Sequence, residues 1–275
     1  MTPAAGIVTA KMADSRKPLV PALERGLAIV EMLAKSRSGL TLSQLTRYLE
    51  LPKSSVFCLL RTLEAAGYVY REAELGKYRI SLRVCSLAHM ALGGIPLREI
   101  ARPYLRCLSE STGLTVHMAV LEQGTCTLIE KMSRPEVKPV ATWVGKHLSL
   151  HCTALGKALS AYIPDEELQT LIREQGLLRH NDNTICSLKR LRTELAHVRE
   201  RGYAIDDEEE EIGVRCIGVP VLNSRREALA AVSLVATTTQ LHAENLQSLA
   251  GTLIGVAKDI SGQVVHQGTE AQFGG

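Results

Sequence analysis

Residues 21–80 change their hydrophobic period at Gly67, and this change most restricts the folds open to the chain. Before Gly67, apolar residues recur every three or four positions, as they do along one face of a helix. After it, two short runs alternate apolar and polar residues, as a strand with one buried face does. In the first helical stretch, four apolar residues share one face: Leu23, Leu27, Val30 and Ala34.

Two further helices are expected before Gly67. Thr41 and Gln44 form a capping-box pattern, in which hydroxyl and amide satisfy each other's backbone donors, so a short helix is predicted over 42–49. Pro52 suits the first turn of the next helix, where its missing N–H costs nothing, and Gly67 ends that helix. Its expected buried face consists of Val56, Leu59, Leu60 and Leu63. The opposite face carries Ser54, Ser55, Cys58, Arg61 and Thr62.

The alternating runs at 68–71 and 77–80 are joined by a loop that contains Gly76, which predicts a β-hairpin. Three helices followed by a hairpin make a winged helix-turn-helix over residues 20–80. This module places its last helix in the DNA major groove, where each base pair shows a distinct pattern of hydrogen-bonding groups. The expected DNA contacts are small polar and basic side chains: Thr41, Ser43, Lys53, Ser54, Ser55, Cys58, Arg61, Arg71, Lys77 and Arg79.

The distribution of charge supports a polyanionic partner for this first part of the chain. Residues 1–80 hold 12 of the 32 Lys and Arg and 7 of the 29 Asp and Glu, a balance of +5. Residues 81–275 hold the other 20 basic and 22 acidic residues, a balance of −2. Aromatic residues make up only 4% of the chain, which argues against the stacking platforms that bind single strands. We therefore expect double-stranded DNA as the partner. The alternative is a protein-interaction module whose basic residues form a solvated face.

Composition and cysteine spacing indicate a soluble, cytoplasmic protein without a membrane partner. The chain is 45% hydrophobic and 22% charged, and no apolar run reaches the roughly 18 residues that a transmembrane helix needs. Seven scattered cysteines without a CxxC pair indicate reduced thiols. Residues 1–19 lack the pattern of a signal peptide. They and residues 266–275 are expected to be flexible tails, with Met12 as an alternative start.

The remainder of the chain predicts a linker helix and an α+β domain. Residues 81–95 form the linker helix, which ends at Gly93 and Gly94 and has an apolar face suited to pairing with another copy. Residues 96–265 mix helices and strands in the order expected of an antiparallel sheet flanked by helices. Strands are expected on either side of the turn at 122–124, at 137–144, and on either side of the turn at 223–227. Helices are expected from 96 to Gly113, with a kink or break at Pro103, and at 153–162, 165–174, 187–201 and 242–262.

The segment LHCTALGKA, residues 150–158, gathers a histidine, a cysteine, a threonine and a lysine around one glycine. Nucleophilic catalysis would need a thiolate, a base and a group that orients the base. His151 and Cys152 are neighbours, and neighbours in an extended segment point to opposite faces, which disfavours proton transfer between them. The eight histidines are dispersed, which disfavours a metal site. We predict no catalytic residue, metal or cofactor, with a Cys-dependent hydrolase as the alternative.

The same segment favours a binding site for a small anion. It runs from an extended stretch into a helix near Thr153, and free N–H groups at a helix N-terminus attract anions. Ala154 and Leu155 would contribute through their backbone N–H groups, while Gly156 would permit close packing of the first turn. Lys157 is expected either to pair with the acidic run at 206–211 or to lie in solvent. The acidic run itself is expected to be a solvated loop.

Four segments follow one another along the chain: LPKSSVFCLLRTLEAAGYV, LHCTALGKALSAYI, VRERGYAIDDEEEEIGVRCIGVPV and AAVSLVA. In sequence and order they resemble the IclR family of bacterial transcriptional regulators, and the resemblance covers residues 20–262. It implies an N-terminal winged helix-turn-helix, a linker helix and a GAF-like effector-binding domain. Members of the family typically bind palindromic operators as dimers or tetramers, so we expect a homodimer or a dimer of dimers. They respond to small carboxylates such as 2-oxo acids, aromatic acids or sugar acids.

The resemblance also implies an effector site. Similar regulators bind the effector at positions that match Ala154, Leu155, Asp206, Cys216 and Ser233, and Leu148 and Val214 would add apolar walls. Asp206 would accept from an effector hydroxyl or protonated carboxyl group, and Ser233 would donate to a carboxylate. Cys216 would offer a weak donor and a polarisable wall. Taken singly, Cys216 also fits a plain core residue, and Asp206 also fits a turn.

Two positions depart from the family pattern. Many relatives have a second serine two positions after the first, where this chain has Val235, and the change favours a more apolar acid. Relatives commonly carry arginine where this chain has Cys58. Because an arginine there could bond to guanine or phosphate, we expect the operator to differ from those of close relatives.

Overall fold

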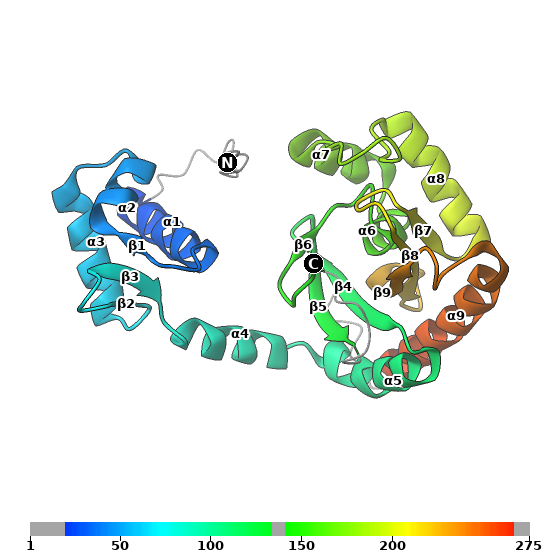
Figure 1. The fold of residues 1–275 in the computed structure, drawn as a ribbon. Helices are drawn as coiled ribbons and strands as arrows, with labels where there is room; N and C mark the ends of the chain where they lie inside the picture. Colours follow the sequence, from blue (N-terminus) through cyan, green and yellow to red (C-terminus); the bar gives the residue numbers. More distant parts are fainter. Residues whose placement is uncertain (1–19, 134–140, 267–275) are drawn as a thin grey trace. The chain divides into compact units, whose positions relative to one another are not determined.

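The computed structural model describes residues 20–133 and 141–266 and divides the chain into two compact units, with the boundary after Ala91 (Figure 1). Residues 1–19 and 267–275, for which we expected flexible tails, lie outside the described residues. So do residues 134–140, which include part of the strand expected at 137–144. None of the helices in the described ranges is both long and apolar enough to span a membrane.

The first unit is the winged helix-turn-helix that the sequence predicts. Its helices α1 (Pro21–Lys35), α2 (Leu42–Leu49) and α3 (Lys53–Ala65) precede a hairpin of β2 (Val69–Arg71) and β3 (Lys77–Ile80). A short strand, β1 (Leu40–Thr41), joins the hairpin in the antiparallel order β1-β3-β2. One core of buried side chains connects the helices to the hairpin: Ile29, Leu33, Leu45, Val56, Leu60, Val69 and Tyr78.

The ends of α2 and α3 follow local signals. The Gln44 N–H donates to Thr41 Oγ1 at 3.3 Å and the Thr41 N–H donates to Gln44 Oε1 at 2.9 Å, which completes the capping box. Just beyond the end of α3, Gly67 has a φ of 77°, a left-handed conformation that glycine adopts without steric cost. Of the expected buried face of α3, Val56 and Leu60 are fully buried, and Leu59 and Leu63 are half-buried against the same core.

α1 buries a different face from the one that its leucine spacing indicates. Its buried residues are Gly26, Ile29 and Leu33, whereas Leu23 and Leu27 are 63% and 56% exposed. Both sets of residues have helical spacing, so periodicity alone does not choose between them. The buried set is the one that meets side chains of α2, α3 and the hairpin in the core of the unit.

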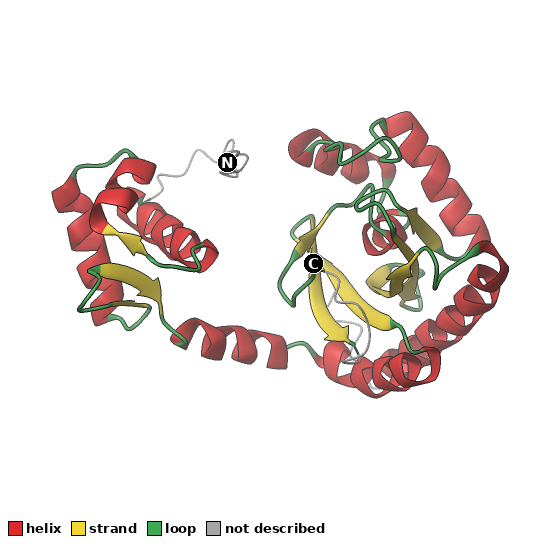
Figure 2. Ribbon diagram, viewed as in Figure 1, coloured by secondary structure: helices red, strands yellow, loops and turns green. Residues whose placement is uncertain are grey.

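The second unit is an antiparallel sheet flanked by helices, which confirms the predicted α+β class (Figure 2). Its six strands lie in the order β6-β5-β4-β9-β8-β7. They are β4 (Thr115–Glu122), β5 (Thr125–Met132), β6 (His147–Leu148), β7 (Ala204–Asp207), β8 (Val214–Leu222) and β9 (Ala228–Thr237). The helices are α5 (Pro96–Thr112), α6 (Ala154–Ser160), α7 (Asp165–Gln175), α8 (Leu188–Arg201) and α9 (Ala243–His266). α4 (Arg83–Gly93) spans the boundary between the units.

Alternate residues of β9 separate the two faces of the sheet. Val232 and Leu234 belong to the core that contains residues of α5 and α9, whereas Ala231 belongs to the core that contains residues of α6 and α8. Because side chains of a strand alternate, Ser233 and Val235 lie on the same face as Ala231. The face toward α6 therefore carries polar positions that the sequence assigns to a site.

Two local expectations differ from the structure. Residues 141–144 form no strand: the Lys146 N–H donates to the Trp143 carbonyl at 3.0 Å in a turn through Gly145, and β6 begins only at His147. α5 continues through Pro103 without ending. Pro103 cannot donate to the carbonyl of Glu99, but both residues are exposed, so water can take the place of the lost donor.

Candidate functional site

α3 presents one exposed face at helical spacing. Ser54, Phe57, Cys58 and Arg61 are exposed along it, and the opposite side of the helix is buried in the core of the first unit. The face combines a hydroxyl, a thiol, a guanidinium and an apolar ring. Such groups can read base edges in a major groove, where a guanidinium recognises guanine and an apolar side chain contacts the methyl group of thymine.

Sequence reasoning misses Phe57, because it selects polar and basic side chains as contacts and assigns apolar ones to a core. The signal is nevertheless present in the sequence. Phe57 lies three positions after Ser54 and outside the buried set of α3, and in the structure it is 42% exposed.

The basic residues of the first unit differ in their surroundings. Lys53 and Arg61 are exposed, and neither takes part in an ion pair within the described ranges. Arg79, by contrast, donates to Glu72 at 2.5 Å and to the Arg37 carbonyl at 3.0 Å. Arg79 therefore stabilises the hairpin and its neighbour loop, while Lys53 and Arg61 are available to a polyanion.

The other predicted contacts lie on α2, α3 and the hairpin. Ser43 is exposed on α2, and the hydroxyl of Thr41 caps that helix. Ser55 and Lys77 are half-buried. The guanidinium of Arg71 lies 5.8 Å from the centre of the Tyr78 ring. That these residues contact DNA remains a prediction.

In the second unit, the register of the sheet brings distant residues into two rows on the face toward α6. In one row, His117 of β4 lies opposite Ser233 of β9. In the next, Val235 of β9 lies opposite Cys216 of β8, which in turn lies opposite Asp206 of β7. Opposed residues of antiparallel strands have side chains on the same face, with Cβ atoms about 4.5–5.5 Å apart. The rows line a cavity of about 200 Å³.

The structure gathers all seven residues of the predicted effector site around this cavity. They come from β6, α6 and the three strands β7, β8 and β9: Leu148, Ala154, Leu155, Asp206, Val214, Cys216 and Ser233. Their convergence is a fact of the fold, and their binding role remains a prediction.

α6 begins in direct contact with the sheet. Its cap residue, Thr153, accepts the Gly156 N–H at 3.0 Å. The N–H groups of the first helical residues have no partner inside a helix, so those of Ala154 and Leu155 are available at the cavity. A Cβ on Gly156 would lie 2.2 Å from the Ser149 carbonyl oxygen, and one on Gly218 would lie 2.4 Å from the Ala154 carbonyl oxygen. Two glycines therefore permit the close approach of α6 to its neighbours.

Further residues complete the cavity wall, and apart from Val235 sequence reasoning does not single them out for contact with a ligand. They are His117, Ala141, Thr142, Lys146, Thr153, Glu210, Glu211 and Val235. Thr142 Oγ1 lies 3.0 Å from His117 Nε2, and Lys146 Nζ lies 3.5 Å from Glu210 Oε1. Nothing in the local sequence distinguishes His117 from an ordinary strand residue, because only pairing of β4 with β9 places it beside Ser233.

Burial alters the protonation of the cavity's titratable groups. Desolvation raises the pKa of Asp206 to about 7, although its carboxylate accepts the Glu209 N–H at 2.9 Å, which lowers the pKa. Desolvation lowers the pKa of His117 to about 3, and the positive charges of Lys131 and Lys146 lower it further. At pH 7 the imidazole is therefore neutral, and the Asp206 carboxyl is close to half-protonated.

The cavity and its surroundings disfavour a Cys-dependent hydrolase. Burial raises the pKa of Cys152 to about 12 and that of Cys216 well above its usual value. His151 bonds through Nε2 to the Leu178 carbonyl at 3.0 Å. Because the thiolate is the nucleophile, protonated thiols are unreactive. Among the described residues, no group of three or more His, Cys, Asp or Glu is placed to hold a metal ion.

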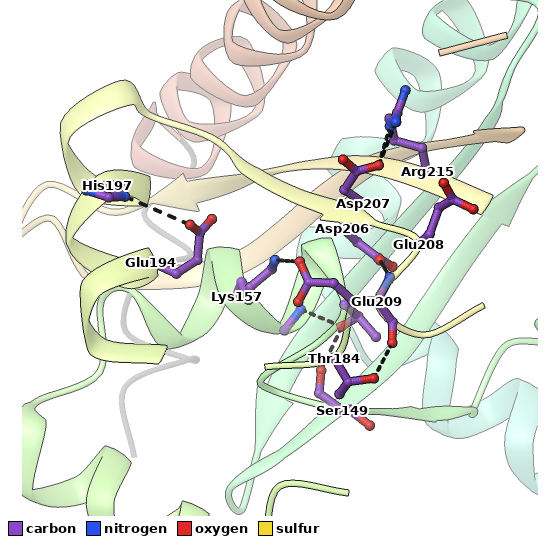
Figure 3. A network of polar contacts seen from close by, with 12 residues as sticks. Ser149, Lys157, Thr184, Glu194, His197, Asp206, Asp207, Glu208, Glu209 and Arg215 are labelled. Carbon is purple, nitrogen blue, oxygen red and sulfur yellow. Dashed lines mark hydrogen bonds and ion pairs between the residues drawn. The ribbon is translucent and has the colours of Figure 1, made fainter. Parts of the chain in front are cut away.

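The acidic run at 206–211 is partly buried, which corrects the expectation of a solvated loop. Asp206 and Glu209 are 3% and 7% exposed. Glu209 forms an ion pair with Lys157 of α6, whose side chain is fully buried (Figure 3). Because a charge is costly to bury without a partner, the run folds inward where it meets Lys157. Glu209 thus connects the carboxyl of Asp206, through its N–H, to α6.

Comparisons with known proteins cover both units. The model of the IclR helix-turn-helix domain matches residues 22–73, and that of the bacterial transcriptional regulator IclR C-terminal domain matches residues 89–262. The HTH-type transcriptional regulator XynR of Escherichia coli K12 is 34% identical over 82% of this chain and 89% of its own length. The transcriptional repressor IclR of the same strain is 31% identical over 88% of this chain and 89% of its own length.

Solved structures share the architecture. The IclR protein of Thermotoga maritima superposes with a TM-score of 0.74 at 26% identity, over 89% of this chain and 98% of its own. An IclR homolog from Microbacterium hydrocarbonoxydans, complexed with 4-hydroxybenzoate, has the same fold, with a TM-score of 0.75 at 24% identity over 89% of this chain and 99% of its own. Family models that match both units, and relatives more than 30% identical over most of the length, establish that the chain belongs to the IclR family of bacterial transcriptional regulators.

Proposed function

We propose that the protein binds a palindromic duplex operator as a homodimer or a dimer of dimers and senses a small carboxylate metabolite. One observation carries the ligand part of this proposal. Seven residues that the family resemblance assigns to an effector site line a single cavity of about 200 Å³, although they come from five separate elements. The match of the first unit to the IclR helix-turn-helix domain supports the proposal that the protein binds DNA.

The exposed face of α3 supports duplex DNA as a partner. The guanidinium of Arg61 can form a bidentate hydrogen bond to guanine, and the ring edge of Phe57 can contact a thymine methyl group. Lys53, at the start of the helix, suits a phosphate. Because Cys58 carries no charge, we expect this helix to select bases that differ from those read by relatives with arginine at that position.

The polarity of the cavity supports a carboxylate as the effector. The N–H groups of Ala154 and Leu155 and the hydroxyl of Ser233 supply donors. Asp206, with a pKa of about 7, donates to the ligand when protonated and accepts when ionised. Leu148 and Val235 are apolar, so the acid is expected to carry an apolar body.

A thermal-shift screen of small carboxylates tests the effector without knowledge of the operator. A ligand that binds only the folded protein stabilises it by about 2.7 kcal/mol at a hundredfold excess over Kd. Ser233→Ala should reduce that shift, because a hydrogen bond to a charged group contributes about 1.5–3 kcal/mol. Asp206→Asn tests the acceptor role in the same way, and 4-hydroxybenzoate belongs in the panel because a protein of this fold holds it.

The control is operator binding without effector, which Ser233→Ala should leave intact because Ser233 belongs to the other unit. An acid that stabilises the parent and both variants equally would place the effector site elsewhere.

The linker helix supports self-association. No residue of α4 is buried, and Leu87 and Met90 are 41% and 63% exposed. Covering these side chains in a symmetric pair would remove apolar surface from water. Sedimentation should show a dimer or tetramer at micromolar concentration, and Met90→Glu should shift the population toward monomer. A parent protein that sediments as a monomer with and without DNA contradicts the assembly.

A further inference from the structure

The cavity wall carries several polar residues beyond those that the carboxylate would use, and His117 is one of them. His117 is 3% exposed and lines the cavity. It lies opposite Ser233, which in turn lies opposite Gly218. The first residue of α6, Ala154, packs against Gly218. Adjacent strands are about 4.8 Å apart, so two strand spacings place the backbone of His117 roughly 10 Å from that of Gly218. His117 and the start of α6 therefore mark different ends of the cavity.

His117 has one unused hydrogen-bonding position. Its Nε2 bonds to Thr142 Oγ1 at 3.0 Å, and no other group of the described residues bonds to its imidazole. A neutral imidazole has one donor nitrogen and one acceptor nitrogen, so whichever role Nε2 takes toward Thr142, Nδ1 keeps the other. Because His117 lines the cavity, a ligand in the cavity can bond to the remaining position.

The surroundings of His117 favour a neutral ligand group rather than a second anion. Burial and two nearby lysines hold the pKa of His117 at about 3, so the ring is uncharged at pH 7. Lys131 Nζ donates to the Thr142 carbonyl at 2.9 Å, and Lys146 is paired with Glu210. Both cations thus already have acceptors in the protein.

Ser233 is the residue of β9 between the two ends, and apolar residues of β8, β9 and α6 lie in the next row. Val235 stands two positions after Ser233, and with Cys216 and Ala154 it forms a small apolar cluster at the cavity. A ligand that reaches from α6 to β4 therefore passes Ser233 and has this apolar cluster beside it.

We propose that His117 determines effector specificity by bonding to a hydroxyl or oxo group at the far end of the acid. The effector class is then a carboxylate whose second polar group is separated from the carboxylate by an apolar body. This inference rests on the proposed carboxylate function and adds the requirement that the effector carries a second polar group.

Matched pairs of acids test it by titration calorimetry on the full-length protein. The pairs are 4-hydroxybenzoate with benzoate and 5-hydroxypentanoate with pentanoate. The parent should bind the hydroxylated member of at least one pair about tenfold more tightly, as one additional hydrogen bond gives. His117→Leu should bring both members within twofold of each other while it keeps affinity for the acid without a hydroxyl.

Two further variants keep the test independent of folding. His117→Asn retains hydrogen-bonding groups and should retain part of the preference. Met118→Leu changes the neighbouring residue of β4, which is buried in the core on the other face, and should behave as the parent. Melting temperatures without ligand establish that each variant is folded.

Failure of this inference differs from failure of the carboxylate function. A parent that binds the acids but does not distinguish the members of either pair overturns the role of His117 alone, as does a preference that survives His117→Leu. A parent that no carboxylate stabilises overturns the proposed function and this inference with it.

Discussion

Gly156 is the residue on which the position of α6 depends most directly. A side chain there would meet the backbone of Ser149 and Leu150, with a Cβ 2.2 Å from a carbonyl oxygen and 2.7 Å from a Cα. Backbone cannot move aside as a flexible side chain can. We therefore expect Gly156→Ala to destabilise the second unit by about 1–3 kcal/mol or more.

Hydrogen exchange of the amides of β8 and β9 measures this loss of stability. Gly255→Ala is the matched control, because Gly255 also lies within a helix, α9, and a Cβ there would have no atom within 4 Å. It should be neutral or stabilising by about 0.5–1 kcal/mol. Equal effects of the two substitutions would show that α6 can move away from its neighbours without cost.

Asp206 should make the stability of the second unit depend on pH. Its pKa rises from an ordinary 3.8 to about 7 on folding, so the folded chain holds a proton that the unfolded chain has released between these values. Stability is therefore lost as pH rises from about 4 to 7, and it levels off above 7. Relative to Asp206→Asn, the parent should lose on the order of 2 kcal/mol between pH 5 and pH 8.

Denaturation of both proteins at several pH values measures the difference. Other titrating groups are common to both proteins and cancel in the comparison. A parent and variant whose stabilities stay parallel over this range would show that the Asp206 carboxyl ionises as it does in water.

At the scale of elements, the short helix α2 depends on its cap. Eight residues are too few for a stable isolated helix, and the capping box satisfies backbone donors at its N-terminus. Thr41→Ala should cost about 1 kcal/mol. Amides in residues 42–46 should then exchange several-fold faster, measured by hydrogen exchange with mass spectrometry.

Ser43→Ala supplies the control for α2, because Ser43 is exposed within the same helix and does not cap it. Unchanged exchange in Thr41→Ala would mean that packing of Leu45 in the core holds the helix without its cap.

At the scale of the whole molecule, operator binding should depend steeply on salt. The excess of basic residues lies in residues 1–80, and each phosphate contact releases counterions from the duplex. The logarithm of affinity should fall linearly with the logarithm of salt concentration. Arg61→Ala should reduce the steepness by about one if it contacts a phosphate, or relax the preference for one base if it contacts guanine.

Arg179→Ala is the control for charge, because Arg179 is an exposed arginine of the second unit, paired with Asp182. It should leave both the slope and the base preference unchanged. Operator affinity that is flat from low to high salt would contradict recognition through phosphates.

Local signals in the sequence predict much of the fold. The capping pair Thr41 and Gln44 places α2 at the residues where the structure has it, and the turn at 122–124 separates β4 from β5. These signals succeed because the interacting groups lie within a few residues of one another. The predicted buried face of α1 is wrong, because two sets of apolar residues share its helical spacing and only packing against distant elements selects one.

The sequence by itself determined the order of the elements, the basic winged helix and, through its motifs, the seven residues now seen around one cavity. Tertiary structure alone decided what surrounds them. It set His117 beside Ser233 through strand pairing, and it buried Glu209 against Lys157 across 52 positions of sequence. Sheet register and the cost of burying an unpaired charge act between segments that are distant in the chain, so no local pattern records them.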